Sequence, residues 1–253
     1  MIQLKSTREL EVMARGGRIL AACHAEVAKH VRPGISTAEI DRIVEEFIRA
    51  HDGAVPAFKG LYGFPGSACL SINEEIVHGI PSPKRVLKEG DILSVDIGVK
   101  YEGMYTDSAY THPAGEIDPV SRMLLDVTKA SLEAGMAAAV VGNHIGDIGH
   151  AVQTVVEAAG FSVVRELVGH GVGFVLHEDI QVPNHGKPKR GTKLMAGMTL
   201  AIEPMVNVGT AATRTLSDKW TIVAADGKRS AHFEHTVAVT PEGPRILTLP
   251  AAA

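Results

Sequence analysis

The segment KEGDILSVDIG at residues 88–98 returns as MAGMTLAIEPM at residues 195–205, and this repeat decides the fold. Both copies combine an apolar, strand-like run with one carboxylate near its end. When the copies are aligned, Asp96 falls on Glu203. Because a duplicated unit tends to fold twice in the same way, these two carboxylates are expected to occupy equivalent places on two related strands.

Two further pairs of segments match, namely IVHGI at 76–80 with VGHGV at 168–172, and GISTAEIDRIV at 34–44 with GNHIGDIGHAV at 142–152. The first of these pairs places His78 on His170. The order of the segments is the same in both parts of the chain. We therefore expect a single domain over residues 1–253, with one half at about 6–112, the other at about 118–240, and a site where the halves face each other.

Capping and turn signals indicate where the elements begin and end. The Ser-x-x-Glu spacing typical of a capping box starts at Ser6 and again at Ser36, and Asp118-Pro119 has the chemistry of an N-cap followed by a first helical position. Helices are expected over 7–30 and 37–50, with two more from 118 to about 159. Strands are expected at 91–100 and 104–112, joined through 101–103, and a hairpin turn at Asp226-Gly227. From Pro241 onward, including the three terminal alanines, the chain is expected to be an unremarkable tail. Helices and an antiparallel sheet in this order predict an α+β fold.

Composition excludes several classes of protein. At 253 residues and 45% hydrophobic content, the chain can bury a large core. No apolar run approaches the roughly 20 residues of a membrane helix, and charged residues near the amino terminus argue against a signal peptide. Two cysteines cannot build a disulfide framework, so a cytoplasmic location is expected. A net charge of -4 offers no broad basic surface, so neither a membrane nor a specific nucleic acid is an expected partner.

Two aspartates lie on the two arms of the predicted hairpin. A two-residue loop at 101–102 or 102–103 would place Asp96 and Asp107 on the same sheet face, whereas a three-residue loop would place them on opposite faces. Like charges on one buried face destabilise a sheet, and a bound cation removes that cost. The alternative is a solvated hairpin face with two ordinary aspartates.

Two glutamates and a histidine extend this acidic set. Glu203 lies in the apolar stretch MTLAIEPMV and Glu234 in AHFEHTVAV, where a lone buried carboxylate would be unfavourable without a metal or a partner. His170 stands between glycines in GHGVG, where the backbone can turn sharply. Four carboxylates and one imidazole suit a pair of Mn, Fe, Co or Zn ions. Such a pair would lower the pKa of a bridging water, and the resulting hydroxide would attack a substrate carbonyl.

At this point the chain resembles the type I methionine aminopeptidases of the pita-bread fold, over nearly its whole length. The segments that carry the resemblance are RPGISTAEID, FPGSACLSINEEIVHGIP, GDILSVDIG with YTDSA, GHGVG, HEDIQVPN, MTLAIEPMV and SAHFEHTVAVT. Only 31 positions separate Glu203 from Glu234, which leaves no room for the insertion of type II enzymes. The resemblance implies the compact bacterial form, with helices outside a curved antiparallel sheet built from two pseudo-symmetric halves.

The resemblance also implies roles for individual residues. Asp96, Asp107, His170, Glu203 and Glu234 would bind two divalent ions. Glu203 would take the proton from the attacking water, His78 would contact the amide nitrogen beyond the scissile bond, and His177 would hydrogen-bond the oxyanion. Spacing, independently of the resemblance, places His232 two residues before Glu234, so in a regular strand it would share the face of Glu234 and act as an outer partner. The substrate would be the free amino terminus of a nascent polypeptide with methionine first and a small second residue.

By the same resemblance, seven residues would form the methionine pocket: Phe58, Leu61, Phe64, Cys69, His78, Leu176 and Trp220. The family more often has Tyr at the position of Leu61 and an aromatic residue at that of Leu176, and Ile180 replaces a usual proline. Cys69 could instead be read as a nucleophile, but no cation or helix start that would activate it is evident in the sequence. A pocket wall is the preferred interpretation.

The remaining expectations concern partners. The resemblance implies a monovalent cation held by carbonyls of Asn73, Glu75 and Ser230, and we expect a monomer. Four basic residues, Arg214, Lys219, Lys228 and Arg229, resemble the surface by which such enzymes contact the ribosome transiently, although a solvated rim explains them equally well. Two rival functions are a proline-specific aminopeptidase or prolidase, which usually carries an extra amino-terminal domain, and a peptide-binding scaffold without catalysis, which typically loses metal ligands.

Overall fold

The computed structural model describes residues 2–250. The first half of the chain forms α1 (Thr7–His30), α2 (Thr37–Arg49), β1 (Ala54–Pro56), the short 3-10 helix η1 (Leu61–Gly63), β2 (Ala68–Ile72), β3 (Glu75–Val77), β4 (Asp91–Tyr101) and β5 (Met104–Ala114). The second half forms α3 (Pro119–Ala137), α4 (Ile145–Ala158), β6 (Ser162–Val163), β7 (Gly169–Gly171), β8 (Glu178–Val182), β9 (Thr199–Ile202), β10 (Met205–Asn207), β11 (Thr213–Thr215), β12 (Ile222–Ala224), β13 (Ser230–His232), β14 (Glu234–Thr240) and β15 (Gly243–Ile246). Each of these two parts of the chain opens with two helices and continues with strands.

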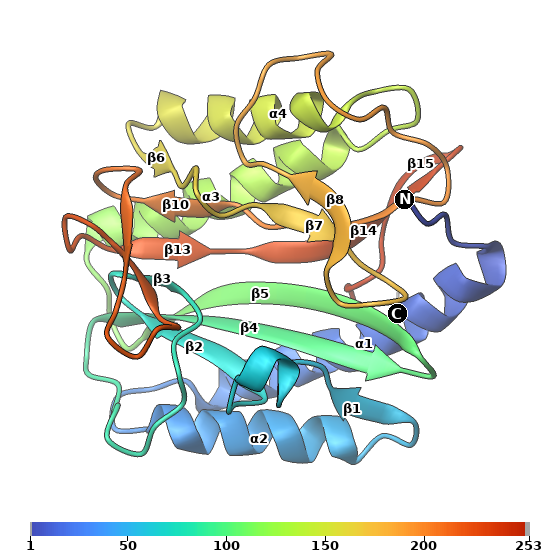
Figure 1. The fold of residues 1–253 in the computed structure, drawn as a ribbon. Coiled ribbons are helices and arrows are strands. Elements are labelled where there is room, and N and C mark those ends of the chain that lie inside the picture. The colour runs from blue at the N-terminus through green and yellow to red at the C-terminus, as the bar shows by residue number, and fades with distance from the viewer. Residues whose placement is uncertain (1, 251–253) are drawn as a thin grey trace.

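One large antiparallel sheet joins the halves, in the order β1-β4-β5-β14-β9-β7-β8, with β2 beside β4 and β15 beside β14. Two smaller sheets, β13-β10-β6 and β11-β12-β3, flank it. Figure 1 shows α4 at the top and α2 at the bottom, with the curved sheet between them. This arrangement confirms the expected α+β pita-bread architecture. None of the helices in residues 2–250 combines the length and the apolar character that crossing a bilayer requires.

Helix starts follow the capping signals. The Ser6 hydroxyl accepts a hydrogen bond from Glu9 N, and the Glu9 carboxylate accepts one from Ser6 N at 2.7 Å, which together complete a capping box. The Ser36 hydroxyl accepts from Glu39 N at 3.2 Å. The Asp118 carboxylate accepts from Ser121 N at 3.0 Å, and proline follows at the first helical position. Both ends of α1 and α2, the start of α3 and the end of α4 therefore lie within a residue or two of the predicted positions.

The register of the β4–β5 hairpin decides where its two aspartates point. Tyr101 pairs with Met104, so the loop has the two residues Glu102 and Gly103, both with positive φ, as in a type I′ turn. Asp96 lies opposite Ala109, and Asp107 lies opposite Gly98. Because side chains alternate between faces, this register places both aspartates on one face. Of the loop lengths that the sequence left open, the two-residue loop at 102–103 is the one that forms.

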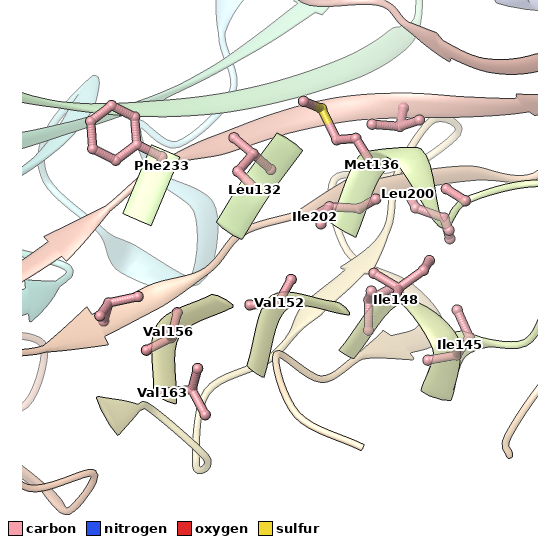
Figure 2. Close-up of a cluster of buried hydrophobic side chains, with 14 of the residues drawn as sticks. Leu132, Met136, Ile145, Ile148, Val152, Val156, Val163, Leu200, Ile202 and Phe233 are labelled. Atoms are coloured by element: carbon pink, nitrogen blue, oxygen red, sulfur yellow. The ribbon is translucent and has the colours of Figure 1, made fainter. Parts of the chain in front are cut away.

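Helix pairs cover the outer face of the sheet and form two main cores. Side chains of α3 and α4, such as Leu132 and Ile148, pack against Leu200 and Ile202 of β9, as Figure 2 shows. A second core joins α1 and α2 to β2 and β4, with Val95 among its fully buried members. Both cores bury apolar helix faces against the strands. The inner face of the sheet is left for polar side chains.

Two expectations about the carboxyl-terminal third are wrong. A turn does form at Asp226-Gly227, but the flanking strands do not pair with each other, since β12 joins β11 and β3 while β13 joins β10. The Asp226 carboxylate accepts hydrogen bonds from Thr210 N at 2.9 Å and Lys228 N at 3.1 Å, so it redirects the chain instead of closing a hairpin.

The segment expected to be an unremarkable tail is part of the sheet. β15 pairs with β14, Leu247 is buried in a cluster with residues of α1, and the Thr248 hydroxyl lies 2.7 Å from His235 Nδ1. A turn after Thr240 returns the chain to the sheet, and the apolar Leu247 then contacts the helix. The three terminal alanines lie outside the described residues.

Candidate metal centre and substrate cavity

The polar residues on the inner face of the sheet come from neighbouring strands. In the sheet order β4-β5-β14-β9-β7, Asp96 lies on β4, Asp107 on β5, Glu234 on β14 and His170 on β7, while Glu203 directly follows β9. Four adjacent or nearby strands and the residue that directly follows β9 thus supply the five predicted metal ligands. The antiparallel register brings these side chains, which lie far apart in sequence, to one place.

Distances confirm that the side chains converge. One potential ligand atom from each of Asp107, His170 and Glu234 lies within 4.8 Å of the others. His170 Nε2 is 3.9 Å from Asp107 Oδ2 and 3.7 Å from Glu203 Oε1. Asp96 joins the group because the β4–β5 register places it on the same face as Asp107, and the two carboxyl groups interact. The five residues form one compact cluster.

The buried carboxylates are poorly compensated by the protein itself. Within residues 2–250, Asp96 Oδ1, Asp107 Oδ1 and Glu234 Oε1 are buried without a hydrogen-bond partner. Buried polar atoms nearly always have partners, so each such atom calls for an explanation. Burial, reinforced by the neighbouring carboxylates, raises the pKa of Asp107 and of Glu234 well above the usual range. Burial raises the pKa of Asp96 to about 7, and repulsion by Glu203 acts in the same direction.

A divalent cation fits these observations. Its charge would supply the interaction that the orphaned oxygens lack, and a set of carboxylates with one imidazole and no thiolate suits Mn, Fe, Co or Zn. The Nδ1 atom of His170 lies 2.9 Å from Gly171 O, so Nδ1 carries the proton and Nε2 is left with a free lone pair toward the carboxylates. The donor set and the oriented histidine are those of a metal centre.

His232 lies beside the cluster as an outer neighbour. Its Nε2 is 3.4 Å from Glu203 Oε2, and the residue is almost fully buried. The strand is not regular here, because β13 ends at His232 and β14 starts at Glu234. His232 therefore approaches Glu203 instead of simply sharing a strand face with Glu234.

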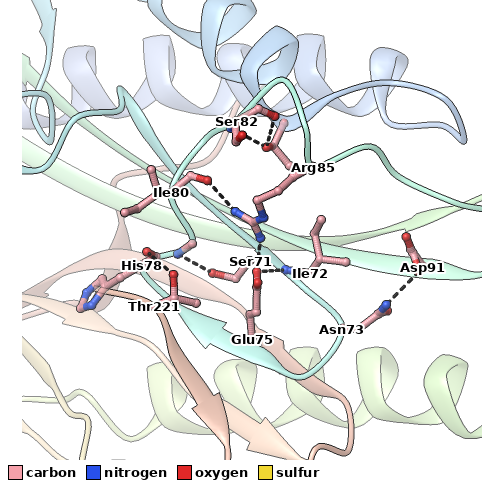
Figure 3. Close-up of polar contacts among 12 residues, drawn as sticks. Ser71, Ile72, Asn73, Glu75, His78, Ile80, Ser82, Arg85, Asp91 and Thr221 are labelled. Atoms are coloured by element: carbon pink, nitrogen blue, oxygen red, sulfur yellow. Dashed lines mark hydrogen bonds and ion pairs between the residues drawn. The ribbon is translucent and has the colours of Figure 1, made fainter. Parts of the chain in front are cut away.

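His78 lies in the loop that follows β3, which Figure 3 shows, and it lines the same cavity as the cluster. His78 has φ of +61°, a left-handed conformation that is unfavourable for a residue other than glycine and must be held by its surroundings. The surroundings are polar: Gly79 N donates to Ser71 Oγ at 3.1 Å, and Arg85 Nη1 donates to Ile80 O at 2.6 Å while the same guanidinium pairs with Glu75. Burial lowers the pKa of His78, which favours the neutral imidazole.

His177 lies in the loop between β7 and β8 and lines the same cavity as the cluster. Its ring centroid is 4.5 Å from that of His170 and 6.1 Å from that of Tyr62. Burial, reinforced by His170, lowers the pKa of His177 to about 4. The ring is therefore neutral at physiological pH and keeps one N–H that can donate a hydrogen bond.

An apolar cavity of about 300 Å³ opens next to the acidic cluster. All seven residues predicted for the methionine pocket line it, together with the five candidate ligands and His177. The rings of Phe64 and Trp220 meet edge to face at 5.2 Å. Burial and the nearby Asp96 raise the pKa of Cys69 well above the usual range, so its thiol is inert and forms a wall.

Sequence reasoning missed five residues of this cavity: Tyr62, Val77, Leu167, Val168 and Met205. Four of them are ordinary apolar residues in or near short strands, and nothing in the sequence separates them from core positions. Tyr62 is 76% exposed at the cavity mouth with φ of +52°. The only available signal was its place between glycines in GLYG, which favours an unusual turn.

The structure also shows where the residues predicted to hold a monovalent cation and the four predicted basic residues lie. Ser230 N donates to Asn73 O at 2.8 Å, and Glu75 follows two residues later at the start of β3. Of the basic residues, Arg214, Lys219 and Lys228 are exposed. Arg229 instead donates to Asp118 Oδ2 at 2.6 Å and to Gly90 O at 2.8 Å, so it links the two halves of the chain.

Comparison with known proteins agrees with this geometry. The chain matches metallopeptidase family M24 over residues 11–241. It is 55% identical over 248 residues to methionine aminopeptidase 1 of Bacillus subtilis, covering 98% of this chain and 99% of that protein.

Solved structures give the same picture. The methionine aminopeptidase of Thermotoga maritima superposes with a TM-score of 0.96 at 44% identity, covering 98% of this chain and 100% of that one. A prolidase of Pyrococcus horikoshii shares the fold alone, with a TM-score of 0.79 at 20% identity, and this chain covers 63% of it. The chain therefore belongs to metallopeptidase family M24 and, within that family, to the methionine aminopeptidases.

Proposed function

We propose that this protein removes the amino-terminal methionine from polypeptides with a small second residue, using two divalent ions from among Co, Mn, Fe and Zn. One observation carries the proposal: five candidate ligands, four on strands of the large sheet and one directly after β9, converge beside an apolar cavity large enough for a methionine side chain. The names of the relatives support the same reaction. Asp96, Asp107, His170, Glu203 and Glu234 would hold the ions, with Asp107 and Glu234 engaging both.

When bound, the ions would supply Lewis acidity to the scissile carbonyl and to the attacking water. Glu203 would take the proton from that water. Its side chain is 13% exposed, whereas that of Asp107 is 4% exposed, so Glu203 has the better access to the cavity. The carboxylate of Glu203 is thus placed to act as the general base.

Two histidines would act on the substrate itself. The N–H of neutral His177 would donate a hydrogen bond to the oxygen that becomes negative in the transition state. His78, held by the network around Arg85, would contact the nitrogen of the scissile amide. Because both rings line the same cavity as the acidic cluster, one bound peptide could reach them together.

The cavity would select methionine by shape. Aromatic rings, the Cys69 thiol and Leu176 give an apolar wall that suits an unbranched thioether. The acidic cluster at the end of this wall would receive a free amino terminus, so a blocked terminus would lose this interaction. Leu176 and Leu61 make the wall aliphatic at two positions, which would leave room for side-chain motion.

The setting of the reaction is also part of the proposal. Two unpaired, buried cysteines suit a reducing compartment, so the enzyme would act in the cytoplasm on nascent chains. It would act as a monomer, with a monovalent cation near the carbonyls of Asn73, Glu75 and Ser230. The exposed Arg214, Lys219 and Lys228 would give a transient contact with the ribosome, which co-sedimentation before and after their charge reversal would test.

Substrate turnover tests the proposal directly. The metal-loaded protein should cleave Met-Ala-Ser, should not cleave acetyl-Met-Ala-Ser, and should lose activity when chelated. Cleavage of x-Pro peptides in preference to Met-Ala-Ser would support a proline-specific enzyme instead. A metal-loaded protein that turns over none of these peptides would support the binding scaffold and refute the proposal.

A further inference from the structure

The segment before α1 packs against the loop that carries His177 and buries a lysine there. The Lys5 side chain is 0% exposed, which is rare for lysine unless it is paired. Its Nζ lies 2.5 Å from Glu178 Oε2 and donates to Gln3 O at 3.0 Å. The backbone N of Lys5 donates to Gly197 O at 2.8 Å, which fixes the segment to the loop before β9.

Glu178 connects this lysine to the loop that carries His177. Glu178 is the first residue of β8 and directly follows His177 in the chain. Its second oxygen, Oε1, accepts a hydrogen bond from Phe174 N at 3.0 Å. One carboxylate therefore ties the beginning of the 172–177 loop to its end, and Lys5 anchors that carboxylate.

Gly173 shows how closely Lys5 is fitted to the loop. Its φ is +151°, and a side chain at this position would collide with the Lys5 stem. The carbonyl of Gly173 accepts a hydrogen bond from Tyr105 N at 2.7 Å, which attaches the loop to β5. The ammonium of Lys5 also lies 5.2 Å from the centre of the Phe174 ring. The backbone of Gly173, the carboxylate of Glu178 and the ring of Phe174 thus all contact the Lys5 side chain.

The loop needs such an anchor because the other contacts of the His177 ring are packing contacts that hold its direction only weakly. Its ring packs against His170 and against Tyr62, which is itself 76% exposed. Leu176, the preceding residue, is buried in the cavity wall. The direction of the His177 ring therefore depends on where the backbone of the loop is held.

We propose that the buried Lys5–Glu178 ion pair is the positioning device for His177, which makes Lys5 a positioning residue. The inference rests on the proposed function, in which His177 donates to the developing oxyanion. A buried ion pair is weak evidence for a role in stability. A misplacement of about 1 Å at a catalytic group can lower the rate by about 10²-fold. Loss of the ion pair should therefore lower kcat more than it changes KM.

A double-mutant cycle tests whether Lys5 acts through His177. Lys5→Met should lower kcat on Met-Ala-Ser by about 10²-fold and change KM by less than about threefold, with metal content unchanged. In a His177→Ala background, the same substitution should change kcat by less than about twofold, because the group that it positions is absent. An unchanged kcat, or an equal loss in both backgrounds, would overturn the proposal.

Arg245→Met is the matched control. It breaks an ion pair with Glu11 of the same length, 2.5 Å, whose side chains are 42% and 54% exposed, and it should leave kcat unchanged. If Lys5→Met fails to fold, Lys5→Met combined with Glu178→Gln removes both charges and keeps the acceptor for Phe174 N–H. This double variant should show the same loss of kcat, and wild-type kcat in it would refute the inference.

Amide hydrogen exchange separates this inference from the proposed function. In Lys5→Met, the amides of residues 173–177 should exchange about tenfold faster than in the wild type, whereas Arg245→Met should leave them unchanged. If the metal-loaded wild type cleaves no methionyl peptide, the proposed function fails. The exchange measurement still shows whether the Lys5–Glu178 pair holds the loop. Unchanged exchange in Lys5→Met would show that the pair does not hold the loop.

Discussion

Asp96 should make the metal-free protein less stable as the pH rises. Asp96 lies on β4 with its Oδ1 atom buried, and desolvation together with repulsion by Glu203 raises its pKa to about 7 from an ordinary value of 3.8. The folded state therefore binds the Asp96 proton more tightly than the unfolded state does. In the absence of a cation, the carboxylate can become charged in the folded protein only at a free-energy cost.

The sign and size of the effect follow from linkage. Because the folded-state pKa is raised, the stabilisation by the bound proton is fully present below pH 3.8 and is lost as the pH rises to about 7. The difference between these two pKa values corresponds to about 4 kcal/mol. Replacement by a neutral, similarly shaped asparagine removes this dependence. Above pH 7, metal-free Asp96→Asn should be more stable than the metal-free wild type by up to about 4 kcal/mol.

Urea unfolding in excess chelator measures the difference directly. Buried histidines such as His24 and His112, whose pKa values burial lowers to about 3 and about 4, give both proteins the same opposite trend, namely less stability at acid pH. Subtracting the variant from the wild type removes that shared contribution. The remaining difference in the free energy of unfolding should be near zero at pH 4 and should grow to its full size by pH 7 to 8. A difference that does not change with pH would refute the reasoning.

Three further outcomes are expected. Asp107→Asn should deplete bound metal and activity together, and two ions retained at full affinity in a metal assay would contradict its role. His177→Ala should lower kcat by about 10² to 10³-fold with metal content retained, as expected for the loss of an oxyanion donor, and unchanged turnover would remove it from the mechanism. Ile148→Ala, at a fully buried position between α4 and the sheet, should lower the free energy of unfolding by about 2 to 5 kcal/mol, and a change within about 0.5 kcal/mol in urea unfolding would contradict the packing described.

The candidate ligands were predictable because the signals that place them are local. The alternation of side chains along a strand and the two-residue loop at Glu102-Gly103 suffice to put Asp96 and Asp107 on one face. Glu203 and Glu234 stand out because a charge in an apolar strand is expensive to bury. None of these arguments needs the partner strand to be known.

Strand partners were harder to predict, because pairing depends on distant segments. Asp226-Gly227 has the residues of a hairpin turn, yet hydrogen bonds from Thr210 and Lys228 to the aspartate send β13 to a different sheet from β12. Leu247 belongs to the core only because α1 presents an apolar face to it. A turn motif specifies local geometry, and the competition among distant strands then decides which of them pair.

The duplication explains the site only up to the point where the two halves differ. The repeat aligns His78 with His170, but His170 lies within β7, whereas His78 follows β3 in a left-handed conformation. A histidine fixed in a strand presents the same nitrogen to its neighbours permanently, which suits a metal ligand. A histidine on a loop held by Arg85 and Ser71 faces the cavity from its edge, which suits a contact with substrate. Two equivalent sequence positions can therefore serve different roles, and the loop contacts, which the repeat does not encode, determine which role each one takes.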